Sequence, residues 1–289
     1  MMTQKVAFLG LGVMGYPMAG HLARCGYDVT VYNRTNTKSE AWAKEHIGRA
    51  VASPADAVVG ADLVFACLGD DNDVREVIGQ AQDQLKPGAI MVDHTTASPT
   101  LARELHEQLR AQDIGFVDAP VSGGQAGAEN GKLSVMCGGA EEHVEAARLA
   151  IESFAARIVH IGPAGHGQLC KAVNQICIAG LVQGLSEGVH FAEQTGIDIN
   201  KVLEAISGGA AQSWQMENRA KTMAADEFEF GFAVDWMRKD LRIALNEGRK
   251  SDARLPVTAL VDQFYADVQA MGGGRWDTSS LVRRLKARD

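Results

Sequence analysis

Cysteine and metal-ligand patterns are sparse in this sequence. Its 289 residues include five cysteines, an odd number with no Cys-x-x-Cys pair, and eight histidines without a spacing such as His-Glu-x-x-His. This pattern predicts neither a disulfide framework nor a metal site. Most of the cysteines lie in apolar stretches, so we expect buried thiols in a reducing compartment. The cysteines are Cys25, Cys67, Cys137, Cys170 and Cys177.

The sequence also lacks an excess of positive charge and long apolar runs. Lysine and arginine total 28 against 36 aspartates and glutamates, and the net charge of −8 argues against nucleic-acid binding. Every apolar run is far shorter than the ~20 residues of a membrane-spanning helix. The first residues lack the charged, apolar and small-residue regions of a secretory leader. We therefore expect a cytoplasmic protein that binds neither nucleic acid nor membrane.

The start of the chain contains a dinucleotide-binding fingerprint. The apolar run Val6-Ala7-Phe8-Leu9 leads directly into Gly10-Leu11-Gly12-Val13-Met14-Gly15, and an amphipathic helical pattern follows. A Gly-x-Gly-x-x-Gly between a strand and a helix is the context in which this motif binds a dinucleotide. The first glycine would allow the tight turn, the second the close approach of a pyrophosphate, and the third the packing of helix on strand. Free N–H groups at the start of the helix would then face the anion.

The end of the second predicted strand indicates which nucleotide binds. Asp28-Val29-Thr30-Val31-Tyr32 is followed by Asn33-Arg34-Thr35, with Lys38 nearby. NAD sites usually place a carboxylate here to bind the ribose 2′-hydroxyl, and this stretch has none. The planar fork of donors on Arg34 suits a 2′-phosphate, and the Thr35 hydroxyl adds a donor. We predict that NADPH is preferred; the alternative is that Arg34 is an ordinary solvated arginine and that NAD also binds.

Strand-like and helix-like stretches alternate up to about residue 162. This alternation predicts an α/β fold, a Rossmann-like doubly wound parallel sheet. Ser53-Pro54 and Ser98-Pro99 have the pattern of an N-cap followed by proline at the first helical position. Strands are predicted at residues 6–9, 29–32, 63–68, 90–92, 115–117, 133–137 and 158–161. Helices are predicted between them at residues 13–25, 37–46, 54–60, 72–84, 98–111 and 141–153.

The pattern changes after Gly162-Pro163-Ala164-Gly165. Residues 167–195 have helical periodicity with apolar residues on more than one side, which predicts a long buried helix. We expect no second set of strands, and hence an all-α domain with this long central helix. The predicted domains are 1–163, which would bind NADP, and 164–289, which would bind substrate and form an oligomer. Further helices are predicted at residues 198–207, 213–223, 234–249, 256–270 and 278–286.

Three segments have side chains suited to catalysis. The backbone N–H groups of Ser122-Gly123-Gly124 could hold a small carboxylate, although a plain glycine-rich turn is an equal alternative. Lys171 and Asn174 share one face of the long helix. In its apolar surroundings Lys171 would be either a stem that extends to water or a desolvated amine that acts as a general acid. The adjacent Lys239 and Asp240 have the pattern of a surface ion pair.

Taken together and in order, these segments resemble the β-hydroxyacid dehydrogenase family, which includes 3-hydroxyisobutyrate dehydrogenases, tartronate semialdehyde reductase and glyoxylate/succinic semialdehyde reductases. Phe8–Ala19 is similar to its N-terminal signature and Asp118–Gly124 to its substrate-binding segment. Gly165–Gln175 is similar to its catalytic segment, and Lys239–Leu241 to its C-terminal cofactor segment. Asp93-His94-Thr95-Thr96 resembles its Asp-x-Ser/Thr-Thr stretch near the nicotinamide. The resemblance spans the whole chain.

The resemblance implies a role for each segment. Lys171 would be the general acid/base, and Asn174 would orient the substrate hydroxyl or carbonyl. Lys239 would lie at the nicotinamide and substrate end, with Asp240 fixing it. The substrate carboxylate would be held by Ser122, Gly123 and Gly124. The nicotinamide would be lined by Cys67, Leu68 and Thr96.

Two features qualify this resemblance. Gln175 stands where some members of the family have a second asparagine. Trp214 and Trp236 fall where C-terminal helices usually close the family's pocket, so they would either line a site for a short acid or lie in the core. The Asn33-Arg34-Thr35 stretch resembles the NADPH-using reductases more than the NAD-using hydroxyisobutyrate enzymes.

The implied activity is the reversible, NADPH-dependent reduction of a small aldehyde acid, such as glyoxylate, succinic semialdehyde or tartronate semialdehyde, to the hydroxy acid. The alternatives are NAD(P)-dependent oxidation of 3-hydroxyisobutyrate or L-serine, imine reduction, and a non-catalytic NADP-binding module. Lys171 argues against imine reductases, which usually lack this lysine. The long apolar helix has more apolar surface than one small domain readily hides, and family relatives are dimers or tetramers, so we expect a homodimer or homotetramer.

Overall fold

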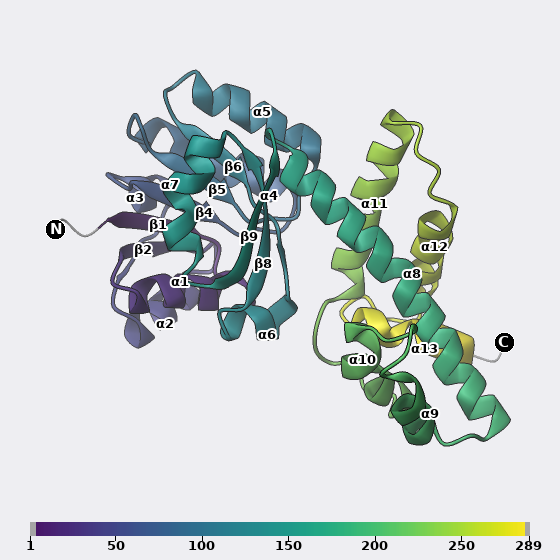
Figure 1. Ribbon diagram of the computed structural model, residues 1–289. Helices are drawn as coiled ribbons and strands as arrows, with labels where there is room; N and C mark the ends of the chain where they lie inside the picture. Colours follow the sequence, from purple (N-terminus) through teal and green to yellow (C-terminus); the bar gives the residue numbers. More distant parts are fainter. Residues whose placement is uncertain (1–3, 287–289) are drawn as a thin grey trace. The chain divides into compact units, whose positions relative to one another are not determined.

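The computed structural model describes residues 4–286 and divides the chain into two compact units (Figure 1). The first unit extends to Lys171 and the second begins at Ala172. This division falls inside the long helix α8 (His166–Thr195), so the first turns of that helix belong to the first unit. No helix among the described residues is both long and apolar enough to cross a membrane.

The first unit is built on a nine-stranded, mainly parallel sheet. Its strands are β1 (Lys5–Leu9), β2 (Asp28–Tyr32), β3 (Arg49–Ala50), β4 (Leu63–Ala66), β5 (Ile90–Asp93), β6 (Gly115–Asp118), β7 (Val121–Ser122), β8 (Leu133–Gly139) and β9 (Ala155–Gly162). Their order is β3-β2-β1-β4-β5-β6-β8-β7, with β9 paired to β8. All pairs from β3 to β6 are parallel, whereas β8 runs antiparallel to β6 and β7. The order of the parallel strands reverses beside β1, which is where doubly wound sheets bind nucleotides.

Helices cover both faces of this sheet (Figure 1). They are α1 (Gly15–Arg24), α2 (Asn36–Glu45), α3 (Pro54–Val58), α4 (Asp71–Ala81), α5 (Pro99–Arg110), α6 (Gly124–Glu129) and α7 (Glu141–Ile151), and the short 3₁₀ helix η1 (Gln82–Gln84) follows α4. Side chains from α1 and α7 bury one face, and those from α3, α4 and α5 bury the other. Because β1 is covered on both sides, its residues 6–9 are all apolar, without the alternation of a half-exposed strand.

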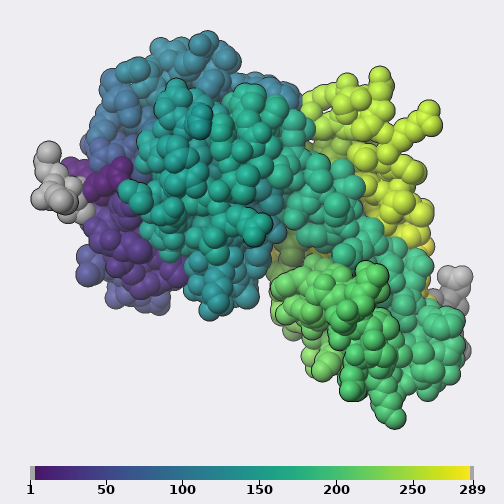
Figure 2. Space-filling model, viewed as in Figure 1, coloured from purple at the N-terminus to yellow at the C-terminus, as the bar shows by residue number. Residues whose placement is uncertain are grey.

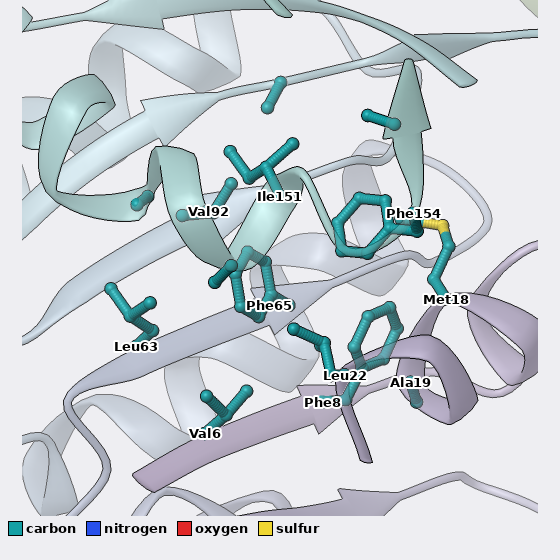
Figure 3. Packing of buried hydrophobic residues seen from close by; sticks show 14 of the residues in the cluster. Val6, Phe8, Met18, Ala19, Leu22, Leu63, Phe65, Val92, Ile151 and Phe154 are labelled. Atoms are coloured by element: carbon teal, nitrogen blue, oxygen red, sulfur yellow. The ribbon is translucent and has the colours of Figure 1, made fainter. Parts of the chain in front are cut away.

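An aromatic cluster lies in the core, on the face of the sheet that α1 and α7 cover (Figure 3). The rings of Phe8 and Phe65, on the neighbouring strands β1 and β4, are 6.1 Å apart between centroids. Phe154 meets Phe65 edge-on at 6.1 Å, and Met18 from α1 packs into the same layer. Each of these side chains is fully buried, so the strand that leads into the Gly10–Gly15 fingerprint is fixed by the core.

The structure confirms the predicted doubly wound sheet and adds three short elements that were not predicted. These are β3, β7 and α6, of two, two and six residues. They are too short to show a period of their own, so only their pairing and packing define them. Both predicted serine caps are present: Ser53 Oγ accepts the Asp56 N–H at 3.1 Å, and Ser98 Oγ accepts the Leu101 N–H at 3.0 Å.

The second unit is all-helical, as predicted. After α8 it contains α9 (Ile199–Ile206), α10 (Trp214–Ala224), α11 (Val234–Lys250), α12 (Pro256–Ala270), η2 (Thr278–Ser280) and α13 (Leu281–Lys286). Within residues 172–286 the only strand-like pairing is an isolated bridge between Ala233 and Asp277. One buried cluster joins all the α-helices, and Tyr265 at its centre donates a hydrogen bond to the Thr278 carbonyl at 3.2 Å.

The long helix α8, predicted to be buried, is buried on one side only. Ala179, Val182 and Val189 are buried, but the opposite side exposes Val173 and Phe191 by 60% and 65%. Part of the α8 surface is uncovered in the space-filling view (Figure 2). An apolar composition on several sides cannot distinguish burial within one chain from an apolar surface that another molecule covers.

The prediction of buried thiols is wrong for two of the five cysteines. Cys137 is buried and Cys67 and Cys170 are half-buried, but Cys25 and Cys177 are exposed. Cys25 is the C-cap residue of α1, where the chain reaches the surface, and Cys177 lies on the exposed side of α8. All five cysteines are free thiols.

Candidate active site

The three fingerprint glycines meet different demands. Gly10 has a φ of +98°, and a Cβ there would overlap the Cys67 carbonyl oxygen. A Cβ at Gly15 would overlap the Gly10 carbonyl oxygen, so these two glycines are required by the packing of the protein itself. A Cβ at Gly12 would meet nothing within 4 Å, so this position faces open space. The N-cap residue of α1, Met14, makes no side-chain capping bond, which leaves backbone N–H groups for an anion. The loop therefore fits the pyrophosphate of a dinucleotide.

The segment after β2 is tied to this loop. Asn33 Oδ1 accepts the Leu11 N–H at 2.9 Å, and Asn33 Nδ2 donates to the Thr35 carbonyl at 3.1 Å. The Asn33 side chain therefore holds the backbone of the fingerprint loop. The Arg34 side chain is 78% exposed, and its Nη1 lies 3.0 Å from Asp73 Oδ1 on α4. This acidic partner was not predicted; its sequence signal is the aspartate-rich start of α4.

Two further loops at the carboxyl ends of β4 and β5 are locked together. Thr95 Oγ1 accepts the Leu68 N–H at 2.8 Å. Gln168 donates from Nε2 to the Thr95 carbonyl at 2.7 Å, and its Oε1 accepts the Ala97 N–H at 3.1 Å. Thr96 lies between these two contacts and is half-buried. The residues predicted to line a nicotinamide, Cys67, Leu68 and Thr96, thus belong to one hydrogen-bonded set of loops.

A buried carboxylate, Asp118, fixes the start of α8. Asp118 Oδ1 accepts the Gly165 N–H at 2.7 Å, and Oδ2 accepts the Gln168 N–H at 2.9 Å. Burial raises the pKa of Asp118 to about 6, although these backbone hydrogen bonds favour the charged form. A Cβ at Gly167 would lie 2.5 Å from the Asp118 carbonyl oxygen, so only glycine allows this approach. Lys171 follows one turn after Gln168 and is buried, with 8% exposure.

Asp93 and His94 are also buried beside this set of loops. Burial raises the pKa of Asp93 to about 7, against the hydrogen bonds that it accepts from Thr95. Burial lowers the pKa of His94 to about 4, so its ring is neutral at physiological pH. The His94 Nδ1 donates to the Ala119 carbonyl at 2.7 Å, which links the end of β5 to the residue after β6.

The Ser122-Gly123-Gly124 segment is accessible. Ser122 ends β7 and is half-buried, whereas Gly123 and Gly124 are exposed. Gly123 and Gly124 have φ values of +131° and +60°, a conformation that favours glycine and presents backbone N–H groups. The segment can therefore receive a carboxylate through its backbone.

In the second unit, α8 and α11 bring four polar residues together. Asn174 Nδ2 donates to Gln175 Oε1 at 2.7 Å, and Gln175 Nε2 donates to Asp240 Oδ2 at 2.7 Å. Lys239 Nζ lies 3.2 Å from Asp240 Oδ1, and the two side chains are only 11% and 2% exposed. The prediction of a surface ion pair is therefore wrong, because this pair is buried. The link through Gln175 was not predicted; its signal is a second polar residue directly after Asn174.

The two tryptophans are not core residues. Trp214, the first residue of α10, is 51% exposed, and Trp236 on α11 is 38% exposed. Lys239 Nζ lies 5.6 Å from the centroid of the Trp236 ring, and Arg219 Cζ lies 4.9 Å from that of Trp214. Both rings thus carry a cation at their face. No group of three or more potential metal ligands occurs among residues 4–286.

Comparisons with known proteins agree with this reading of the fold. Residues 5–162 match the family model of the NAD-binding domain of 6-phosphogluconate dehydrogenase. Residues 165–285 match that of the NAD-binding domain of NADP-dependent 3-hydroxyisobutyrate dehydrogenase. The chain is 57% identical to an uncharacterized oxidoreductase of Shewanella frigidimarina, over 98% of both chains. It is 33% identical to the 2-hydroxy-3-oxopropionate reductase of Escherichia coli, over 98% of this chain and 97% of that one.

A solved structure shows the same architecture. The 3-hydroxyisobutyrate dehydrogenase of Mycobacterium tuberculosis, described with L-serine, superposes with a TM-score of 0.91 at 30% identity, over 99% of this chain and 100% of that chain. The fold and the site together define an NAD(P)-dependent oxidoreductase that acts on CH–OH groups. The chain belongs to the β-hydroxyacid dehydrogenase family.

The different surroundings of the fingerprint glycines predict different effects of the same substitution. Gly12→Ala should leave the fold intact and weaken NADPH binding at least about tenfold, because the added methyl group occupies the space for the pyrophosphate. Gly15→Ala should instead lower the unfolding free energy by about 1–3 kcal/mol, because its methyl group overlaps backbone. Denaturant unfolding and NADPH fluorescence titration measure the two effects.

Gly79→Ala is the matched control, since a Cβ at Gly79 also meets nothing within 4 Å but lies in α4, outside the fingerprint. It should leave NADPH binding unchanged and should raise, not lower, the unfolding free energy by about 0.5–1 kcal/mol, because alanine favours the helix over glycine. Normal NADPH binding by Gly12→Ala would contradict the assignment of Gly12 to the pyrophosphate.

Proposed function

We propose that this protein reduces a small aldehyde acid to the hydroxy acid with NADPH, reversibly, and that Lys171 is the general acid. The observation that carries the proposal is the burial of Lys171 in the second turn of α8. Asp118 fixes the start of this helix through its bonds to Gly165 and Gln168. A desolvated amine in a fixed position is suited to proton transfer. We also propose residues 1–163 as the NADP-binding domain and residues 164–289 as the domain for substrate and assembly.

The proposed mechanism assigns one task to each group. When bound, the nicotinamide supplies a hydride to the aldehyde carbon. Lys171 donates its proton to the oxygen that becomes the alkoxide, and Asn174 orients that oxygen. Lys239 places positive charge at the substrate, held by Asp240 at 3.2 Å. The substrate carboxylate would be bound by the backbone of Ser122, Gly123 and Gly124.

The relatives support this class of substrate. The Escherichia coli relative is named for 2-hydroxy-3-oxopropionate, which is tartronate semialdehyde, and the Mycobacterium tuberculosis structure is described with L-serine, an amino acid with a β-hydroxyl group. Tartronate semialdehyde, succinic semialdehyde, glyoxylate and methylmalonate semialdehyde therefore form the test panel. Oxidation of L-serine and 3-hydroxyisobutyrate with NADP⁺ or NAD⁺ tests the second candidate activity.

The mechanism predicts the effect of removing the amine. With the best aldehyde acid of the panel, Lys171→Ala should lower kcat by about 10²- to 10⁴-fold, the usual contribution of general acid catalysis. The Kd for NADPH should stay within a factor of two, because the lysine is assigned to the substrate. Loss of absorbance at 340 nm and NADPH fluorescence titration provide the measurements.

Lys201→Ala on α9, at an exposed position, serves as the control and should retain full activity. An active Lys171→Ala variant would refute the assigned mechanism. Turnover with no member of the panel in either direction would refute the proposed activity.

We propose that NADPH is preferred over NADH through Arg34, whose exposed side chain directly follows Asn33, the residue bonded to the fingerprint loop. Arg34→Ala should raise the KM for NADPH by about 10- to 100-fold, the loss of a charge-assisted hydrogen bond to phosphate. The KM for NADH should change less than threefold. Arg110→Ala removes an arginine that pairs only within its own helix, with Glu107 at 2.8 Å, and should change neither value. Equal effects of Arg34→Ala on both cofactors would contradict the proposal.

We propose that the exposed apolar side of α8 forms the contact of a homodimer or homotetramer. Leu181 and Phe191 lie on this side with 39% and 65% exposure. Light scattering should give two or four times the chain mass of 30.9 kDa, and Leu181→Glu with Phe191→Glu should give the mass of one chain. Leu149→Glu on α7 introduces the same charge at a site 74% exposed in the first unit, and should leave the assembly intact. A wild-type mass of one chain would contradict the proposal.

A further inference from the structure

Gln175 lies between Asn174 and Asp240 in the second unit and is hydrogen-bonded to both. It is 2% exposed, and its carboxamide has a partner on each side. Its Oε1 accepts from Asn174 at 2.7 Å, and its Nε2 donates to Asp240 Oδ2 at 2.7 Å. A second contact from Nε2 reaches the sulfur of Met237 at 3.7 Å. Asp240 in turn lies 3.2 Å from the ammonium of Lys239. One connected path thus runs from Asn174 to Lys239.

The chemistry of these groups fixes the direction of every hydrogen bond on the path. A carboxylate paired with an ammonium only accepts, so Gln175 must present its NH₂ group to Asp240. Its carbonyl oxygen then necessarily faces Asn174, and Asn174 must use its NH₂ group to reach it. This orientation leaves Asn174 Oδ1 and one N–H for another molecule. The charge of Asp240 therefore determines which atoms Asn174 can offer to a substrate.

We propose that Gln175 is a positioning residue for reduction, which sets the orientation of the Asn174 amide and the place of the Lys239 ammonium together. The inference rests on the substrate roles proposed for Asn174 and Lys239. Gln175 itself need not touch the substrate. Its length is specific: asparagine would be shorter by one C–C bond of about 1.5 Å and could not keep both 2.7 Å contacts.

The first test removes the amide and keeps the volume. Gln175→Met should lower kcat/KM for the best aldehyde acid by about 10- to 100-fold, because the reacting groups are misplaced. Rates are expressed per NADPH-binding site, from titration of each preparation, so that loss of folded protein does not appear as loss of kcat. The Kd for NADPH should stay within a factor of two. Gln175→Asn should give an intermediate loss.

The matched control is a second buried glutamine of the same helix. Gln183 is 8% exposed and donates only to Glu187, one turn away on α8, at 2.7 Å. Gln183→Met makes the same chemical change without touching the path, and should retain kcat/KM within a factor of two. Equal losses in both variants would overturn the proposal, because they would indicate a general effect on α8.

A pair of substitutions tests the direction of the hydrogen bonds. Gln175→Glu places a second carboxylate against Asp240 and should lower kcat/KM about as much as Gln175→Met. Combining it with Asp240→Asn reverses donor and acceptor between positions 175 and 240, while a carboxylate still accepts from Asn174. The double variant should recover at least about tenfold over Gln175→Glu. Roles of the two residues that do not depend on their mutual hydrogen bond would predict additive losses instead.

A measurement independent of turnover follows the Lys239 ammonium, which lies 5.6 Å from the ring of Trp236. The Trp236 emission is obtained by subtracting the corresponding Trp236→Phe variant. In Gln175→Met, released Lys239 should leave the ring, so quenching by iodide should fall while quenching by neutral acrylamide stays constant. Gln183→Met should change neither. Unchanged iodide quenching in Gln175→Met would overturn the positioning role of Gln175, whether or not the wild-type protein reduces an aldehyde acid. Absence of any turnover by the wild-type protein would instead refute the proposed function.

Discussion

The buried Asp118 carboxylate is the constraint on which the start of α8 and the position of Lys171 depend. A carboxylate out of contact with water is costly unless N–H donors surround it, and the start of a helix provides them. Its bonds to Gly165 and Gln168 determine where α8 begins. The same constraint requires glycine at 167, because any side chain would collide with Asp118. This contact also fixes the backbone position of Lys171, because the backbone of a regular helix is determined from one turn to the next.

A similar arrangement occurs twice along α8. Gln168 and Gln175 are seven residues apart, close to two helical turns, so they project from nearly the same side of the helix, with Lys171 between them. The Gln168 side chain is hydrogen-bonded to the backbone of Thr95 and Ala97 after β5, and its own N–H donates to Asp118. The Gln175 side chain is hydrogen-bonded to Asn174 and Asp240. In both cases a glutamine with both ends bonded fixes loops or side chains that would otherwise rotate. Rotamer entropy is thereby lost during folding rather than on substrate binding.

Sequence reasoning predicted the features whose signals are local or periodic. The fingerprint, the alternation of strands and helices, the serine caps and the length of α8 each have a signature within a few turns of chain. The short elements β3, β7 and α6 carry no period, and their existence depends on pairing with distant segments. The same holds for side-chain partners: Asp73 lies 39 residues from Arg34, and Asp240 lies 65 residues from Gln175. Exposure of Cys177 and Phe191 was missed because composition describes a surface as apolar without saying what covers it.

The contact between Arg34 and Asp73 would not prevent Arg34 from binding the 2′-phosphate of NADPH. With side chains 78% and 30% exposed, the pair lies in high dielectric, where such contacts contribute about 0–1 kcal/mol. A phosphate group brings nearly two negative charges and several acceptor oxygens, and bonds to such groups are worth about 1.5–3 kcal/mol each. The phosphate would therefore displace Asp73 from the guanidinium. An aspartate beside the arginine is for these reasons compatible with the proposed NADPH preference.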